Sequence, residues 1–244
     1  AGENMGRANL NLSGKQLQLV KKLRQVNKDV IVVYVNGKPI AEPWIDKNIS
    51  GVVESWESGT TAGTAVAEVL FGDVNPGGKL PLTFPRSVGQ LQMIYNHKPS
   101  QYFHKYAFEK VTPLYPFGHG LSYSNFEYSE FVVSEVVNDK ISISVDVTND
   151  SEFDGEEVVQ LYFRDSYSSV TRPVKELVRY KRVVIASGET KTIDFHLDIK
   201  DLAFYDINMN LCVEMGEFEF MVGGSSDDKQ LITETLDIKK RYDY

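Results

Sequence analysis

The hydrophobic pattern of this 244-residue chain changes its period near residue 127, and no other feature constrains the fold as strongly. Before that point, apolar residues recur at helical spacing or form short continuous runs. After it, they alternate with polar residues, as in residues 141–147 and 218–222. Alternation is typical of half-buried strands, whereas the first pattern is typical of mixed helix and strand. We therefore expect two units of different fold class.

Residues 1–86 predict helices that alternate with strands. The spacing of Ser13 and Gln16 is that of a capping box, which predicts a helix running to Asn27. The β-branched run at 30–35 predicts a strand covered on both faces. Two or three strands are too few for a complete parallel sheet. We therefore expect an incomplete α/β unit with an exposed apolar face, in a chain cut from a longer one. The remaining predicted elements are a helix at 42–47, a strand at 51–56 and a helix at 62–71.

Residues 127–244 predict about seven short strands separated by turn signals such as Asn138-Asp139 and Ser187-Gly188. That number of strands in about 110 residues is typical of an immunoglobulin or fibronectin type III sandwich. A Cys…Trp…Cys framework is absent from the sequence, which favours the fibronectin-like version. Residues 87–126 lack clear periodicity, and we expect them to form an extended connecting segment packed on the first unit.

The formal net charge is −8 and is unevenly distributed. Residues 1–126 carry 13 Lys and Arg and nine Asp and Glu, whereas residues 127–244 carry 13 and 25. The change of sign supports two units of different character. A net acidic chain is a poor match for nucleic acid, so we expect no nucleic-acid partner. The sequence has no run of 18 apolar residues, and we expect no membrane partner.

Residue patterns for metal, nucleotide or nucleophile chemistry are missing. The histidines make no HxH or HExxH spacing, and the glycines make no phosphate-binding loop, so we expect no metal and no cofactor. Cys212 lies in an alternating segment and is interpreted as a buried small apolar residue. The histidines are His97, His104, His119 and His196.

Among 34 carboxylates, Glu3 differs by its position. It precedes the first predicted helix in a Gly-flanked stretch, with Arg7 four residues later. An acid on an irregular loop beside a cation can be a catalytic group, or it can simply form an ion pair. The residues alone leave both interpretations open.

Several ordered motifs resemble glycoside hydrolase family 3, of the bacterial β-glucosidase and β-xylosidase type, over essentially the whole chain. The motifs are Gly2-Glu3 with Arg7, Leu10-Asn11-Leu12-Ser13-Gly14-Lys15-Gln16, Val35-Asn36-Gly37-Lys38-Pro39-Ile40, Pro43-Trp44-Ile45, Ala67-Glu68-Val69-Leu70-Phe71-Gly72-Asp73-Val74-Asn75-Pro76-Gly77-Gly78-Lys79-Leu80-Pro81-Leu82-Thr83-Phe84-Pro85-Arg86, Tyr95-Asn96-His97-Lys98 and Leu114-Tyr115-Pro116-Phe117-Gly118-His119-Gly120-Leu121-Ser122-Tyr123.

The resemblance implies a multidomain retaining enzyme that removes terminal non-reducing β-D-glycosyl residues from oligosaccharides. Its members have an N-terminal (β/α)8 barrel, an α/β sandwich domain and a fibronectin-like domain. The resemblance implies that residues 1–86 are an incomplete α/β sandwich domain, the C-terminal part of the second domain, and that residues 127–244 are the fibronectin type III-like β-sandwich. The family's nucleophile is an Asp in a Ser-Asp-Trp-like barrel motif, which this sequence lacks. Glu3 matches the Gly-Glu motif of the acid/base, so it is the candidate catalytic residue. The family also implies a periplasmic or secreted location.

Other motif positions have structural interpretations. His119 stands where most family members carry Tyr, and we interpret it as a packing residue. The chain departs from the family's Pro-Gly-Gln-Glu at residues 57–61, which puts any sugar contact of that loop in doubt. Trp44 and Trp56 could stack on a sugar or fill the interior. Exposed aromatics of the sandwich, such as Tyr162, Tyr167 and Tyr180, could bind polysaccharide, although a bracing role for the sandwich is favoured.

Two functions follow, from different classes. In the first, the chain is the C-terminal part of an exo-acting β-glycosidase, inactive alone and completed by a barrel domain in cis or in trans. In the second, it is a non-catalytic remnant that binds carbohydrate or acts as a scaffold. The recognisable loop around Glu3 favours the first function.

Overall fold

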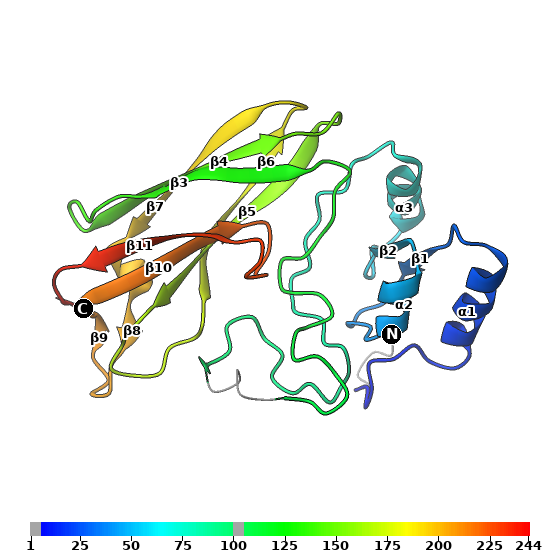
Figure 1. The fold of residues 1–244 in the computed structure, drawn as a ribbon, viewed down its shortest axis with the longest axis horizontal. Helices are drawn as coiled ribbons and strands as arrows, with labels where there is room; N and C mark the ends of the chain where they lie inside the picture. The colour runs from blue at the N-terminus through cyan, green and yellow to red at the C-terminus, as the bar shows by residue number, and fades with distance from the viewer. Residues whose placement is uncertain (1–5, 100–104) are drawn as a thin grey trace. The chain divides into compact units, whose positions relative to one another are not determined.

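The computed structural model describes residues 6–99 and 105–244, which form two compact units (Figure 1). The α/β unit comprises residues 6–74, 83–93 and 105–115, and the β-sandwich unit comprises residues 75–82, 94–99 and 116–244. This confirms the predicted fold class, an α/β part followed by an all-β part. The domain boundaries at residues 86 and 126 stay predictions.

The α/β unit contains helices that alternate with two parallel strands, as predicted. Strands β1 and β2 pair in parallel, with Ile31 opposite Gly51 and Tyr34 opposite Glu54. Its elements are α1 (Gln16–Val26), β1 (Ile31–Tyr34), α2 (Pro43–Asn48), β2 (Gly51–Glu54) and α3 (Ala62–Phe71).

One face of β1 is covered, and the other is largely open. Val32 and Tyr34 point to the same side, because side chains alternate along a strand, and they pack in a core with Ile45. On the opposite side, Ile31 and Val35 are 52% and 70% exposed. The β-branched run predicted cover on both faces, and within the described residues only one face has it.

Helix α1 also has one face packed on the core and another face exposed. Leu17 and Val20 pack on the core, whereas Leu19, Leu23 and Val26 are exposed. The last three recur at helical spacing and share one face. The expected exposed apolar face of the first unit is therefore present. The exposed apolar set is defined as Leu19, Leu23, Val26, Ile31 and Val35.

The predicted capping box at the start of α1 is wrong. The helix begins at Gln16, with Lys15 in the cap position and no side-chain cap hydrogen bond. Gly14 has a φ of +61°, so the chain reverses there and Ser13 lies before the turn. At the other end of the unit, α3 stops at Gly72 as predicted, since Gly72 adopts the left-handed conformation of a helix C-cap.

Within the described residues, the β-sandwich unit has seven strands of 7 to 11 residues, which agrees with the predicted number, and three strands of two or three residues. Two sheets, β11-β10-β5-β6 and β3-β4-β7, enclose its core, while β12-β9-β8 forms a small third sheet (Figure 1). The strands are β3 (Phe126–Val133), β4 (Lys140–Asn149), β5 (Gly155–Asp165), β6 (Glu176–Ile185), β7 (Thr190–Asp198), β8 (Phe204–Tyr205), β9 (Leu211–Val213), β10 (Gly216–Gly223), β11 (Ile232–Ile238) and β12 (Tyr242–Asp243).

The connecting segment is divided between the two units, whereas the sequence analysis placed all of it on the first. Residues 116–124 belong to the β-sandwich unit. Phe117 stacks on Tyr95 with ring centroids 4.4 Å apart, and Tyr95 meets Tyr162 of β5 edge-on. Aromatic burial of this kind stabilises a segment that lacks its own ladder of hydrogen bonds.

Candidate active-site loop

Glu3, the predicted acid/base, lies outside the described residues. The described residues begin at Gly6 and show how the segment that follows it is held. Arg7 donates a hydrogen bond from Nη2 to the carbonyl oxygen of Asn11, at 2.7 Å. That bond ties the Arg7 side chain to the backbone four residues later. The predicted pairing of Arg7 with Glu3 stays a prediction.

Three hydrogen bonds fix residues 10–12 against residues 41 and 42. The Ala41 N–H donates to the Leu10 carbonyl at 2.8 Å, and Asn11 Nδ2 donates to the Ala41 carbonyl at 2.9 Å. The Leu12 N–H donates to Glu42 Oε1 at 2.8 Å. Bonds on three consecutive residues leave the segment little freedom to slide.

The residues that contact this segment belong to a buried part of the α/β unit. Ile40, Ala41 and Ile45 are 4%, 1% and 1% exposed, and Ile40 and Ile45 belong to the core of the α/β unit. A shallow pocket opens on the loop between Arg7 and Gly14. Guanidinium, amide and hydroxyl groups line it, and such groups hydrogen-bond hydroxyl-rich ligands.

A second polar group, missed by the sequence analysis, lies at the carboxyl ends of β1 and β2. Asn36 Nδ2 donates to Glu54 Oε1 at 3.1 Å, and the Trp56 N–H donates to the same oxygen at 3.2 Å. Burial raises the pKa of Glu54, although these donors oppose the rise. Ligands of α/β sheets bind beyond the carboxyl ends of strands, so the position of Glu54 directly after a β-branched run was the available signal.

Both tryptophans are half-buried and pack against other residues of the α/β unit, which favours the second of their two predicted roles. Trp56 packs edge-on against Phe84, with centroids 5.9 Å apart. Trp44 packs against the α/β core, and Lys21 Nζ lies 5.1 Å from its ring centroid.

The aromatics proposed for the sandwich surface differ from one another. Tyr162 is fully buried, so its interpretation as an exposed aromatic is wrong, whereas Tyr167 and Tyr180 are 83% and 66% exposed. Tyr162 is buried because the connecting segment covers it through Tyr95. His119 accepts a hydrogen bond from the Leu80 N–H at its backbone carbonyl, at 2.8 Å, as expected of a residue in a packed segment.

No metal-binding cluster of three His, Cys, Asp or Glu side chains occurs within residues 6–99 and 105–244. His104 lies outside these residues. Cys212 is fully buried, as predicted, and burial raises the pKa of its thiol. A buried protonated thiol is a packing group and not a nucleophile. Of the helices in the described part of the chain, none is long and apolar enough to cross a membrane.

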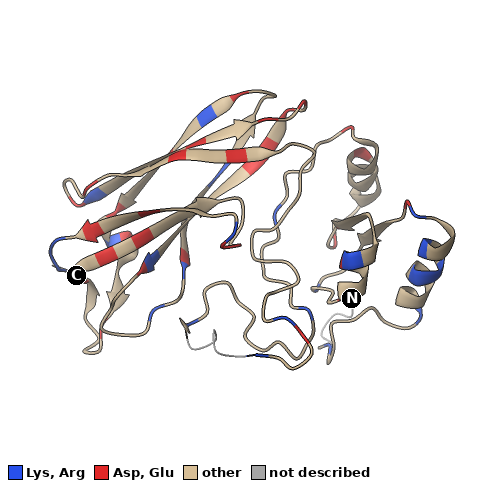
Figure 2. Cartoon of the chain, in the orientation of Figure 1, with Lys and Arg blue, Asp and Glu red and all other residues tan. Residues whose placement is uncertain are grey.

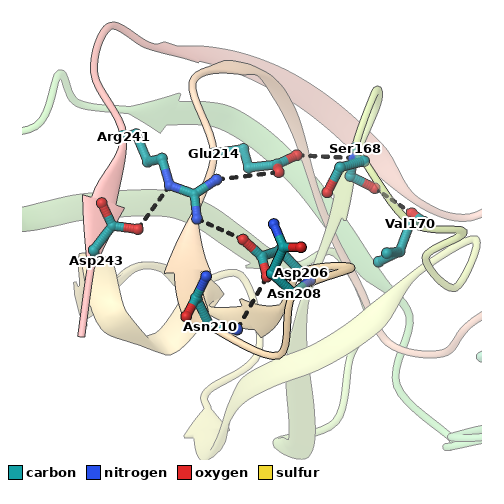
Figure 3. Close-up of polar contacts among 9 residues, drawn as sticks. Ser168, Val170, Asp206, Asn208, Asn210, Glu214, Arg241 and Asp243 are labelled. Atoms are coloured by element: carbon teal, nitrogen blue, oxygen red, sulfur yellow. Dashed lines mark hydrogen bonds and ion pairs between the residues drawn. The ribbon is translucent and has the colours of Figure 1, made fainter.

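Three carboxylates converge on Arg241 beside β8, β9 and β12 (Figure 3). The guanidinium is 2.7 Å from Asp206 Oδ2, 3.5 Å from Glu214 Oε1 and 2.7 Å from Asp243 Oδ1. The hydrogen bond from Arg241 and those from backbone N–H groups hold the pKa of Asp206 at about 2. Because the cation engages all three carboxylates, this cluster stabilises the C-terminal strand and offers no free ligand set.

Figure 2 shows Asp and Glu spread over several strands of the sandwich and mixed with Lys and Arg. The acidic balance of residues 127–244 is therefore typical of a solvated surface.

An α/β unit followed by a fibronectin-like sandwich is the architecture expected of the C-terminal region of a family 3 glycosidase. The family model for the glycosyl hydrolase family 3 C-terminal domain matches residues 1–123, and that for the fibronectin type III-like domain matches residues 157–226. The chain belongs to glycoside hydrolase family 3.

The relatives are β-xylosidases and β-glucosidases. A β-xylosidase of Formosa agariphila is 43% identical over 244 residues, covering 98% of this chain and 34% of that protein. The periplasmic β-glucosidase of Salmonella typhimurium is 38% identical over 93% of this chain and 31% of its own length. The chain thus spans about a third of these relatives.

Solved structures agree with these sequence matches. A β-glucosidase of Erythrobacter marinus superposes with a TM-score of 0.91 at 38% identity, over 97% of this chain and 32% of that one. A Listeria innocua β-glucosidase in complex with isofagomine superposes with a TM-score of 0.89 at 31% identity, over 97% of this chain and 34% of that one.

Proposed function

We propose that the chain is the C-terminal, acid/base-bearing part of a retaining, exo-acting β-glycosidase, of β-glucosidase or β-xylosidase type. A barrel domain, in cis or in trans, supplies the nucleophile. The observation that carries this proposal is the anchored segment 10–12, which follows Glu3 by seven to nine residues and Arg7 by three to five. A loop that positions an acid requires fixed backbone hydrogen bonds of this kind, whereas a scaffold does not.

The chemistry requires two carboxylates about 5 Å apart. The barrel carboxylate attacks the anomeric carbon while Glu3 protonates the departing glycosidic oxygen. The sugar is then held as a covalent ester. Glu3, now ionised, removes a proton from water, which attacks the same carbon and releases the sugar with its configuration retained. Arg7, in this scheme, orients the loop that carries Glu3.

The relatives suggest the substrate class and the location. Solved Listeria innocua structures hold glucose and laminaribiose, and the Salmonella typhimurium relative is periplasmic. For this chain we infer terminal non-reducing β-D-glucosyl or β-D-xylosyl residues as substrate, and a periplasmic or secreted enzyme.

The chain alone is expected to show no glycosidase turnover, because its sequence lacks the nucleophile motif. The assay uses the purified 244-residue chain and an aryl β-glucoside, with and without a separately produced barrel domain. Activity that appears only on mixing supports the proposal. Clear hydrolysis by the chain alone contradicts it, and persistent inactivity together with oligosaccharide binding by the chain favours a non-catalytic module.

The exposed apolar set is expected to make the isolated chain bind an apolar fluorescent dye, because its five large apolar side chains are open to solvent. A double substitution, Leu23→Lys with Val26→Lys, is expected to lower that fluorescence at unchanged circular dichroism. Lys181→Glu, on an exposed part of β6, is the control and should leave dye binding unchanged. If the double substitution leaves dye binding unchanged, the dye does not bind at the exposed apolar set, which contradicts this prediction.

A further inference from the structure

A cavity of about 560 Å³ lies at the end of the β-sandwich unit where β3, β5 and β11 begin and β10 ends. Every described residue that lines it belongs to that unit. Pockets that hold small ligands in proteins measure about 300–1,000 Å³. The cavity therefore has the size of a small-molecule site, and its wall chemistry indicates which ligand would fit.

A buried ion pair forms one wall of this cavity. Glu157 of β5 is 2% exposed, and its Oε2 lies 3.1 Å from Lys79 Nζ. The Tyr128 hydroxyl donates to Glu157 Oε1 at 2.9 Å, and Lys79 Nζ donates to the Gly120 carbonyl oxygen at 3.2 Å. Burying two charges is costly, and these hydrogen bonds offset part of the cost while they fix both groups in place. The ion pair is therefore a preorganised polar wall.

The two charges of this wall cancel. Among the described residues that line the cavity, Lys79 and Glu157 alone carry formal charges when His is counted as neutral. An anion would be repelled by Glu157 and a cation by Lys79, so a charged ligand gains little. A neutral ligand can use both groups, because an ammonium donates hydrogen bonds and a carboxylate accepts them. Hydroxyl groups do both, so a neutral ligand rich in hydroxyls suits this wall.

The other walls of the cavity supply amide, hydroxyl and aromatic groups. Ser225 and Gln230 line it, and the Ser225 hydroxyl donates to Gln230 Oε1 at 3.2 Å. Tyr123, which is 48% exposed, and Phe126, which is half-buried, also line it. Aromatic residues beside a few hydrogen-bonding groups are typical of ligand pockets. A sugar ring has an apolar C–H face and a rim of hydroxyls, and it matches this combination.

Glycine at position 224 keeps the polar wall in this form. A Cβ there would lie 2.5 Å from Glu157 Oε1 and 3.5 Å from Lys79 Nζ. A larger residue would therefore displace the carboxylate, which is the flexible end of a side chain and can move without a shift of the backbone. Substitution of Gly224 thus alters the cavity chiefly at one group.

We propose that this cavity binds a short neutral oligosaccharide, so that the β-sandwich unit is a sugar-binding module as well as a brace. The inference does not depend on the proposed function, because the described lining residues all belong to the β-sandwich unit. It also differs from binding at the exposed aromatics Tyr167 and Tyr180, neither of which lines the cavity.

The test is a titration of the ¹⁵N-labelled 244-residue chain with cellobiose, followed by NMR. The backbone N–H resonances of Gly120, Gly224 and Ser225 are expected to shift together and to saturate. Inorganic phosphate, a charged probe, and sorbitol, a polyol without a ring, should give no saturable shift at the same concentrations. The proposal is overturned if cellobiose gives no saturable shift at these three residues, if it shifts residues 7–14 instead, or if phosphate or sorbitol binds as well.

Two pairs of variants test the walls separately. Gly224→Ala is expected to weaken cellobiose binding roughly tenfold, the effect of losing one hydrogen bond to a charged group. Gly78→Ala is its control, because a Cβ there meets nothing within 4 Å. Tyr123→Ala, at an exposed side chain that folding does not require, should weaken binding about five- to tenfold, whereas Tyr180→Ala should have no effect. Unchanged affinity in Gly224→Ala or in Tyr123→Ala, or a loss in Tyr180→Ala, would overturn the proposal.

Discussion

Replacing Glu3 by Gln in the full-length enzyme is expected to lower kcat/KM for a phenyl β-glycoside by roughly 10²–10⁴-fold, the usual contribution of a general acid. The amide cannot protonate the departing oxygen. With a 2,4-dinitrophenyl β-glycoside, kcat/KM should fall far less, because that leaving group needs no proton. Initial rates with both substrates provide the measurement.

The control for this variant is Asp29→Asn, which removes an exposed carboxylate from the same unit and should leave both rates unchanged. If Glu3→Gln hydrolyses both substrates at the normal rate, the acid/base lies elsewhere. In that case the interpretation of Glu3 as an ion-pair partner of Arg7, which the residues alone left open, is the better one.

Gly120→Ala is expected to destabilise the β-sandwich unit by roughly 2–3 kcal/mol. A Cβ at Gly120 would lie 2.2 Å from the carbonyl oxygen of Gly78, and backbone cannot move aside as a flexible side chain can. Gly78→Ala is the matched control, because a Cβ there meets nothing within 4 Å. Urea unfolding of the chain, followed by the fluorescence of its aromatic residues, measures the difference.

A midpoint for Gly120→Ala equal to that of Gly78→Ala would contradict this close approach of residues 78 and 120. It would also remove the physical reason for glycine at position 120 of the Phe117–Tyr123 motif. A large loss of stability in Gly120→Ala, without one in Gly78→Ala, supports the close approach of the backbone at residues 78 and 120.

The sequence predicted those parts of the fold that local chemistry determines. Alternation over residues 141–147 predicted β4, because one face of that strand meets the core and the other meets solvent. Asn138-Asp139 predicted a tight turn, and both residues have positive φ angles of 52° and 60°, as a type I′ turn requires. Gly72 predicted the end of α3 for the same reason.

Contacts between distant segments were not predictable in this way. The hydrogen bond from the Leu12 N–H to Glu42 joins residues 30 positions apart, and the burial of Tyr162 depends on Tyr95. The supposed capping box at Ser13 failed because Gly14 turns the chain before the helix starts. The candidate acid/base itself came from family resemblance, since nothing in the composition separates Glu3 from the other carboxylates.

The most direct test of the account is the product that Glu3→Gln forms in sodium azide. Azide attacks the glycosyl-enzyme without a general base, so we predict a β-glycosyl azide, of retained configuration, from the dinitrophenyl substrate, and none from the wild-type enzyme. Proton NMR distinguishes the two anomers by their coupling constants. An α-glycosyl azide would contradict the retaining mechanism, and the absence of any azide product from Glu3→Gln would contradict the assignment of Glu3 as the acid/base.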